Sequence, residues 1–310
     1  MRHRPVWKAP ALGRMLAMLC LLSSGLLCSL TGHAADILLA GVEDSPGVQA
    51  FTQALRELRP NDTVRFEALA QLPTPGNLPA DTRLILLDLA CLDWRLQDIA
   101  GPATLVLRIS RLQARQRLND IHPPHLSLLW SDPPPGRQLR LTKVLLPQVK
   151  RVGVLYDNHS EFLLDELRRA ARPLGLEVVT QRWENTHDSR ALQALLKKSD
   201  VLLGLDDPDL YNPQTAKNVL LSSYARQMAL IGPNTAFVKA GSLASTYSDQ
   251  HDWLVILDEL LDRPTSTWPR TYYPSRFKVS SNPQVARSLG IEQIDDVLVA
   301  TLLAEGERRP

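Results

Sequence analysis

Short, continuously apolar segments alternate with amphipathic segments along most of this chain. Runs such as residues 36–42, 83–89 and 104–109 have the length of single strands. Between residues 47 and 58, apolar side chains instead recur at spacings of three and four, which predicts a helix. Strands that are apolar on both faces are typical of parallel sheets covered by helices on both sides. The pattern therefore predicts an α/β fold with doubly wound parallel sheets.

The same pattern begins again after residues 147–150. Further strands are expected at residues 151–156, 176–181, 201–205 and 229–232, with helices between them. We expect a first lobe of residues 35–146 and 242–262, and a second lobe of residues 147–241 and 275–310. Two lobes joined by several crossings imply an interlobe cleft, and ligands prefer domain interfaces and the carboxyl ends of parallel strands.

Residues 1–34 have the three parts of a secretory signal peptide. Four basic residues precede an apolar stretch at 15–30, and Gly32-His33-Ala34 supplies a small-residue cleavage site. A membrane anchor is the alternative, but the stretch is short for a span, which needs about 20 residues. A lipoprotein is also excluded, because lipid attachment needs a small residue directly before the cysteine and Leu27 precedes Cys28. We therefore expect cleavage after Ala34 and export to the periplasm.

Charge and cysteine content narrow the class of protein. The leader contains basic residues and no acid, so it accounts for the formal net charge of +2, and the rest is slightly negative. A dedicated nucleic-acid binder would carry a strong basic excess, so no nucleic-acid partner is expected. Cleavage would leave Cys91 alone, without an internal disulfide. Its apolar surroundings in sequence indicate a buried, unreactive thiol.

Motifs for enzyme chemistry are missing from the sequence. It contains no GxSxG, P-loop, GxGxxG or CxxC motif. His122 and His125 enclose two prolines, which prevent the helical turn of a paired-histidine zinc site. Asp206 and Asp207 end an apolar strand without a nearby histidine or lysine, which favours capping or ligand hydrogen bonding over acid–base catalysis. We expect a binding protein, not an enzyme, with no metal and no cofactor.

Two further groups of residues are candidates for binding. The densest basic run consists of Arg108, Arg111, Arg115 and Arg117. A solvated helix face is the favoured interpretation of this run, with an anion site as the alternative. Aromatic residues near expected strand ends are Trp94, Trp130, Trp183, Tyr156 and Tyr247. Each alone is more typical of a core, but together they make an aromatic cleft plausible.

From Arg151 onward the sequence resembles a known family. The resemblance is carried by RVGVLYDNHSEFLLDELRRAARPLGLEV, by the stretch from VLLGLDDPDLYNP to GSLASTYS, and by FKVSSNPQVARSLGI. These segments resemble the substrate-binding proteins of ABC transporters related to the tryptophan- and tyrosine-type binding proteins. The resemblance covers about residues 140–291. It implies a type I periplasmic-binding fold, in which two hinged α/β lobes close over a small solute.

The resemblance also implies ligand-facing positions. Tyr156, Asp157 and Asn158 follow a strand after which the family often has Asn-Pro. Asp207 matches the acid of the family's Leu-Pro-Asp-Pro turn, and Asp206 replaces the first proline. In the first lobe, relatives place a small-residue Gly-Thr-x-Ala-Ala turn after the third strand. Residues 89–94 are bulkier here and fill the space of a ligand carboxylate.

The leading hypothesis is an exported solute-binding protein that delivers a small ligand, such as an amino acid or another small carboxylate, to an inner-membrane ABC permease. The expected ligand-binding residues are Glu43, Asp44, Ser45, Trp94, Tyr156, Asp157, Asn158, Asp207 and Tyr247. The alternative is a periplasmic sensor or interaction protein that keeps the fold without delivering solute, and the altered turn at residues 91–94 motivates it. A monomer is expected in either case.

Overall fold

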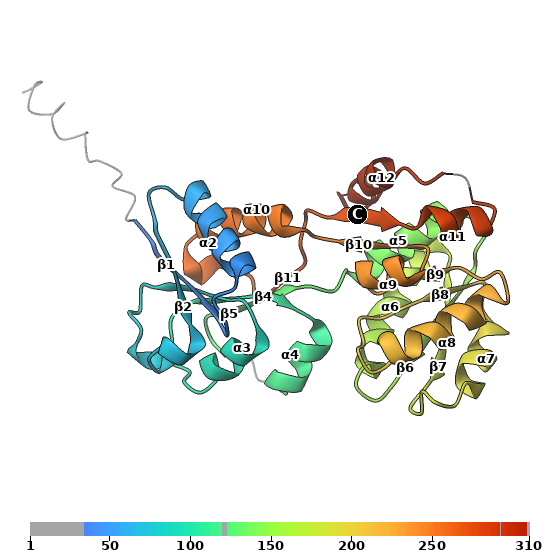
Figure 1. The fold of residues 1–310 in the computed structure, drawn as a ribbon, viewed down its shortest axis with the longest axis horizontal. Coiled ribbons are helices and arrows are strands. Elements are labelled where there is room, and N and C mark those ends of the chain that lie inside the picture. Colours follow the sequence, from blue (N-terminus) through green and yellow to red (C-terminus); the bar gives the residue numbers. More distant parts are fainter. Residues whose placement is uncertain (1–33, 120–122, 292, 309–310) are drawn as a thin grey trace, which may run out of the picture. The chain divides into compact units, whose positions relative to one another are not determined.

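A computed structural model describes residues 34–119, 123–291 and 293–308. The predicted signal peptide therefore lies, apart from Ala34, outside the described residues. The described chain forms two α/β lobes, each built on one sheet (Figure 1).

The first sheet has the strand order β11-β5-β4-β3-β1-β2, and its neighbouring strands are parallel. Its strands are β1 (Asp36–Gly41), β2 (Thr63–Ala68), β3 (Arg83–Leu86), β4 (Thr104–Ile109), β5 (Leu126–Trp130) and β11 (Thr271–Tyr272). The helices of this lobe are α2 (Pro46–Leu58), α3 (Leu89–Arg95), α4 (Arg111–Leu118) and α10 (Gln250–Leu261).

The second sheet has the order β12-β10-β9-β8-β6-β7, in which only β10 and β12 pair antiparallel among the described strands. Its strands are β6 (Arg151–Tyr156), β7 (Glu177–Arg182), β8 (Val201–Leu203), β9 (Leu230–Ile231), β10 (Ala244–Tyr247) and β12 (Lys278–Ser281). The helices are α5 (Pro135–Leu145), α6 (Leu164–Ala171), α7 (Arg190–Leu196), α8 (Pro213–Tyr224), α9 (Thr235–Ala240), α11 (Pro283–Ser288) and α12 (Asp296–Arg308).

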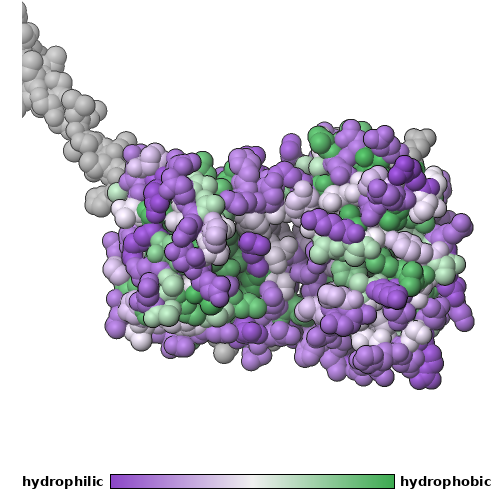
Figure 2. All heavy atoms as spheres, viewed as in Figure 1, coloured by the Kyte–Doolittle hydropathy of each residue, from purple (hydrophilic) through white to green (hydrophobic). Residues whose placement is uncertain are grey.

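Both sheets are buried on both faces. Along β1, Ile37 and Leu39 belong to one apolar cluster, while Leu38 and Ala40 belong to another on the opposite face. Hydrophilic side chains cover most of the face shown in Figure 2, and the hydrophobic ones gather in smaller areas over each lobe. The predicted α/β fold with two doubly wound, parallel-rich lobes is confirmed.

Two segments belong to the second lobe, although the sequence assigned them to the first. Leu139 and Leu141 of α5 pack in the same core as Val152 and Leu167, so the crossing precedes this helix. Strand β10 pairs with β9 and β12 of the second sheet, and only α10 after it packs on the first. Apolar spacing predicts a strand or helix locally, but its partner depends on contacts distant in sequence.

The expected strand at residues 83–89 ends early, and the expected turn after it is helix α3. The helix forms because Asp88 caps it, with Oδ1 accepting the backbone N–H of Cys91 at 2.9 Å. This cap brings the bulky side chains of residues 89–94 into an ordered helical turn. The first-lobe segment that differs from the family is therefore helical.

Gly153 in β6 lies against Ser199 with no room for a side chain. A Cβ there would sit 2.3 Å from Ser199 Oγ and 2.8 Å from Ser199 Cβ. We expect Gly153→Ala to lower the free energy of unfolding by about 1–3 kcal/mol, because the buried pair must separate. Chemical denaturation would measure the loss. Gly47→Ala is the matched control, since its nearest neighbour lies 3.9 Å away; equal losses in the two variants would contradict this account.

Candidate functional site

The strand order of each sheet indicates where a ligand would bind. When β11 is left out of the first sheet and β12 out of the second, the remaining strands of each sheet have the doubly wound order 2-1-3-4-5. Ligands of such sheets bind beyond the carboxyl ends of the strands, at the switch point where the strand order reverses. These switch points lie between β1 and β3 in the first sheet and between β6 and β8 in the second.

At the first switch point, Asp88 occupies the backbone amides with its own carboxylate. Its Oδ2 accepts the N–H of Val42 at 2.7 Å, and its Oδ1 accepts the N–H of Cys91. Burial and the nearby Asp88 charge raise the pKa of the Cys91 thiol, so this cysteine is a poor nucleophile. Trp94 is buried in the core, where its Nε1 donates to the Pro73 carbonyl at 3.1 Å. The structure therefore places Trp94 in packing contacts instead of in a cavity.

Two cavities adjoin at the carboxyl edge of the first sheet. One, of about 470 Å³, is lined by Ser45, by residues of α2 and by the start of α10. The other, of about 430 Å³, lies at the switch point beside Val42 and Asp88. Leu107 and Arg108 line both. Among the expected ligand residues of this lobe, Ser45 lines a cavity and also caps α2.

Glu43 and Asp44 are exposed in the loop between β1 and α2. The Asp44 carboxylate accepts a hydrogen bond from Gln49 Nε2 at 3.2 Å. Tyr247 ends β10 and is half-buried, and Ser248 after it lines the larger cavity. These three residues thus lie near the cavities without lining them.

Arg108 has an unusual backbone. The pairing of β4 with β5 shifts register between Val106 and Ile109, and Arg108 within this bulge has a φ of 57°. A left-handed conformation costs a non-glycine residue about 1–2 kcal/mol. The side chain is exposed, and no hydrogen bond or ion pair joins it to the described residues. Strained positions of this kind occur preferentially at functional sites.

Arg111 and Arg115 connect the first lobe to the second. The Arg111 side chain is only 11% exposed and pairs at 2.5 Å with Asp132 after β5 and with Glu166 of α6. Arg115 stacks over the ring of Phe162 at 4.6 Å. The predicted solvated helix face is therefore wrong for Arg111, because its acidic partners are remote in sequence.

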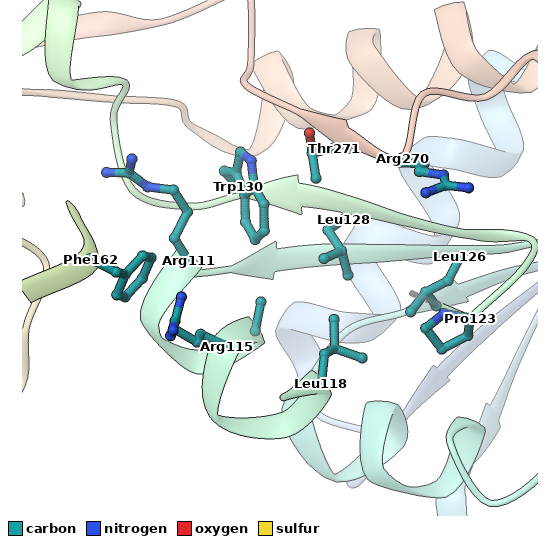
Figure 3. A pocket seen from close by; sticks show the side chains of 11 residues that line it. Arg111, Arg115, Leu118, Pro123, Leu126, Leu128, Trp130, Phe162, Arg270 and Thr271 are labelled. Atoms are coloured by element: carbon teal, nitrogen blue, oxygen red, sulfur yellow. The ribbon is translucent and has the colours of Figure 1, made fainter. Parts of the chain in front are cut away.

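An apolar cavity of about 380 Å³ lies beside these arginines (Figure 3). Leu128 and Trp130 of β5, Leu118 of α4 and Phe162 of the second lobe line it, with Arg111, Arg115 and Arg270 around them. Of the aromatic residues expected near strand ends, Trp130 thus lines a cavity. Trp183 is buried, its Nε1 donates to the Asp188 carbonyl at 2.8 Å, and it lines a second-lobe cavity of about 460 Å³.

The second switch point gathers acidic side chains. Asp157 follows β6, and Asp207 follows β8; one oxygen of each lies within 4.8 Å of the other and of an oxygen of Asp209. Asn158 Nδ2 donates to Glu184 at 3.2 Å, and Tyr156 packs against the second-lobe core. A cavity of about 460 Å³ adjoins the acids. The structure thus brings together the expected Asp157, Asn158 and Asp207, whereas sequence reasoning missed Asp209.

Comparison with known proteins finds a family match that covers most of the second lobe. Residues 134–256 match the model of the ABC transporter substrate binding protein family. The resemblance predicted from the sequence is confirmed over this segment, which runs from the start of α5 into α10 and contains Asp157 and Asp207. No curated relative matches the chain. Among the described residues, no helix is long and apolar enough to cross a membrane.

Several solved structures share the fold of this chain. The ligand-free, open structure of CD0873, a substrate-binding protein from Clostridium difficile, has a TM-score of 0.64 at 16% identity, covering 84% of this chain and 97% of that one. An ABC domain from Streptococcus pneumonia in complex with L-Trp has a TM-score of 0.53 at 19% identity, covering 86% and 97%. A conserved domain protein from Vibrio cholerae has a TM-score of 0.53 at 18% identity, covering 86% and 98%.

Asp206 predicts how stability depends on pH. Burial, and secondarily the charge of Asp132, raise the pKa of Asp206 from 3.8 to about 6. Between about pH 4 and 6 the Asp206 carboxyl keeps its proton in the folded state but loses it in the unfolded state. The free energy of unfolding is therefore greatest below this window and falls as the pH rises through it. We expect Asp206→Asn to raise the free energy of unfolding at pH 8 by about 1–3 kcal/mol, with little change at pH 4.

Denaturant titrations at both pH values would measure this difference. Asp81→Asn is the control, since Asp81 is an exposed carboxylate of the first lobe. A gain for Asp206→Asn that is equal at pH 4 and pH 8 would show that burial of the charge is not its cause.

Proposed function

We propose that residues 35–310 are exported after removal of the leader and act as the solute-binding component of an ABC transport system. The match of residues 134–256 to the substrate-binding family carries this proposal. The basic, apolar and small-residue parts of the leader support export to the periplasm. The partner would be an inner-membrane permease, and the protein would act by binding instead of by catalysis.

Arg108 supports a carboxylate as part of the solute. Arg108 lines two adjoining cavities, and its side chain has no partner among the described residues. A planar guanidinium suits a carboxylate, which it can bind through two parallel hydrogen bonds. Phe51, Leu107 and Trp253 offer apolar surface in the larger cavity, whose volume is in the range of small-molecule sites. The solute is therefore a small carboxylate with an apolar body.

Residues of both lobes would contact the solute when the lobes close. Tyr156, Asn158 and Tyr247 would contribute from the second lobe, and Ser45 from the first. A solute that contacts both lobes favours the closed state by its difference in affinity for the two states. Arg111 already joins the lobes through Asp132 and Glu166.

A specific observation favours a second candidate, the sensor or interaction protein. Asp88 holds the amides of Val42 and Cys91 at the first switch point, so a ligand carboxylate cannot use them. A chain with this arrangement could keep the fold and present its surface to a periplasmic partner.

The binding test is thermal unfolding of residues 35–310 against a panel of amino acids, other small carboxylates and sugars. A carboxylate at 100 times its dissociation constant should add about 2.7 kcal/mol. Arg108→Ala should remove the shift, and Arg226→Ala, which changes an exposed second-lobe arginine, should retain it. A shift that survives Arg108→Ala refutes the proposed anchor, and no shift across the panel favours the sensor.

The strain at Arg108 gives an independent prediction. Glycine adopts the φ of 57° without the cost that Cβ imposes. Without ligand, Arg108→Gly should therefore have a free energy of unfolding higher by up to about 1 kcal/mol, and so a higher thermal midpoint. It should bind no carboxylate. Calorimetry of unfolding measures the first effect. A lower midpoint than that of the unchanged protein would mean that the arginine side chain supports the fold.

A further inference from the structure

Asp207 carries a buried oxygen without a partner. The residue is 1% exposed, and its Oδ1 accepts the N–H of Asp209 at 3.0 Å. Its Oδ2 is buried and accepts no hydrogen bond within the described chain. Buried polar atoms in native proteins are almost always satisfied, and a buried charge needs a counter-charge. A cation beside this oxygen would satisfy it.

The neighbours of this oxygen are also acids. Asp157 is 8% exposed, and its Oδ1 accepts the N–H groups of His159 and Ser160 at 2.8 and 3.0 Å. Asp209 is exposed. Across residues 34–119, 123–291 and 293–308, no arginine or lysine forms an ion pair with any of the three carboxylates. Within the described chain these carboxylates therefore accept hydrogen bonds, including one from Ser160 Oγ to Asp157 Oδ1 at 3.1 Å, but no basic side chain offsets their mutual repulsion.

We propose that Asp157, Asp207 and Asp209 bind one Ca²⁺ ion at the carboxyl edge of the second sheet. Each contributes an oxygen, and the three oxygens lie within 4.8 Å of one another. Ca²⁺ binds oxygen ligands at 2.3–2.6 Å, so one ion reaches oxygens up to about 5 Å apart. Carboxylates are hard ligands, and without histidine or cysteine the set disfavours zinc and copper.

The surroundings can complete the coordination. Ca²⁺ takes six to eight oxygen ligands, including water. Asp157 and Asp209 line the cavity of about 460 Å³, together with the polar side chains of Asn158, Glu184 and Thr186. Water in this cavity can supply the remaining ligands.

The ion would join the loops that follow β6 and β8. Asp157 belongs to the first loop, and Asp207 and Asp209 belong to the second. Binding would therefore stabilise the second lobe whether or not the protein carries a solute. The sequence alone predicted no metal, because Asp157 comes close to the other two acids only in the folded chain.

Calorimetric titration of residues 35–310 with CaCl₂ after treatment with EDTA tests the site. We expect one ion per chain, with a dissociation constant of about 1 mM or tighter, and a thermal midpoint several degrees higher at 100 times that constant. Asp209→Asn changes an exposed side chain and should fold normally, yet bind Ca²⁺ at least 10-fold more weakly. Asp81→Asn is the matched control and should bind as the unchanged protein does.

Asp207→Asn separates a metal site from a structural carboxylate. It removes an uncompensated buried charge, so we expect a higher midpoint than that of the unchanged protein in EDTA, and no further rise with CaCl₂. Absence of Ca²⁺ binding up to about 10 mM, or equal affinity in Asp209→Asn and Asp81→Asn, would overturn the proposal. A thermal shift with a primary diamine but not with CaCl₂ would also overturn it, because the acids would then hold an organic cation.

Discussion

Helices cover both faces of each sheet, so charged side chains of the central strands can be solvated only where these strands end. In the first lobe, Asp88 and Arg108 lie at such ends, and in the second lobe Asp157 and Asp207 do. The apolar interior therefore determines where chemistry can occur before any particular side chain is considered. What differs between the lobes is how these terminal charges are balanced.

The first lobe balances its acids with its own groups. Asp88 accepts two backbone N–H groups, and Asp132 pairs with Arg111. Arg108 remains as a positive charge that opens on the cavities. In the second lobe, Asp157, Asp207 and Asp209 have no basic partner within the described chain, and Asp207 Oδ2 has no hydrogen bond there. Within the described chain, the first lobe thus offers the unpaired guanidinium of Arg108, and the second lobe offers a cluster of carboxylates.

Local patterns in the sequence were sufficient for the strands and the fold class. Apolar runs predicted β1, β4 and β6, because a strand buried on both faces leaves a continuous run. Helix α3 was missed since its apolar residues do not follow a single face, although Asp88 three residues before Cys91 is a capping signal. The sheet joined by β10 depends on hydrogen bonds to distant strands, which no local pattern encodes.

The candidate site was less predictable for the same reason. Asp157 and Asp207 were identified through the family resemblance, but Asp157 comes close to Asp207 and Asp209 only when β6 and β8 align. Arg111 was assigned to a solvated face because Glu166, its partner in the other lobe, is 55 residues away. Charge pairing between lobes leaves no periodic signal, so interpretation of the arginines required the fold.

Two departures from the family pattern in the second lobe add negative charge. Asp157 stands where relatives often have asparagine, and Asp206 stands where they have proline. Asp206 lies near Arg111 and accepts a hydrogen bond from Asn234, yet its pKa remains raised to about 6. A carboxylate solute would be repelled by this edge and attracted by Arg108. It would therefore bind with its acidic group toward the first lobe, and a cation held by Asp157, Asp207 and Asp209 would reduce the repulsion as the lobes close.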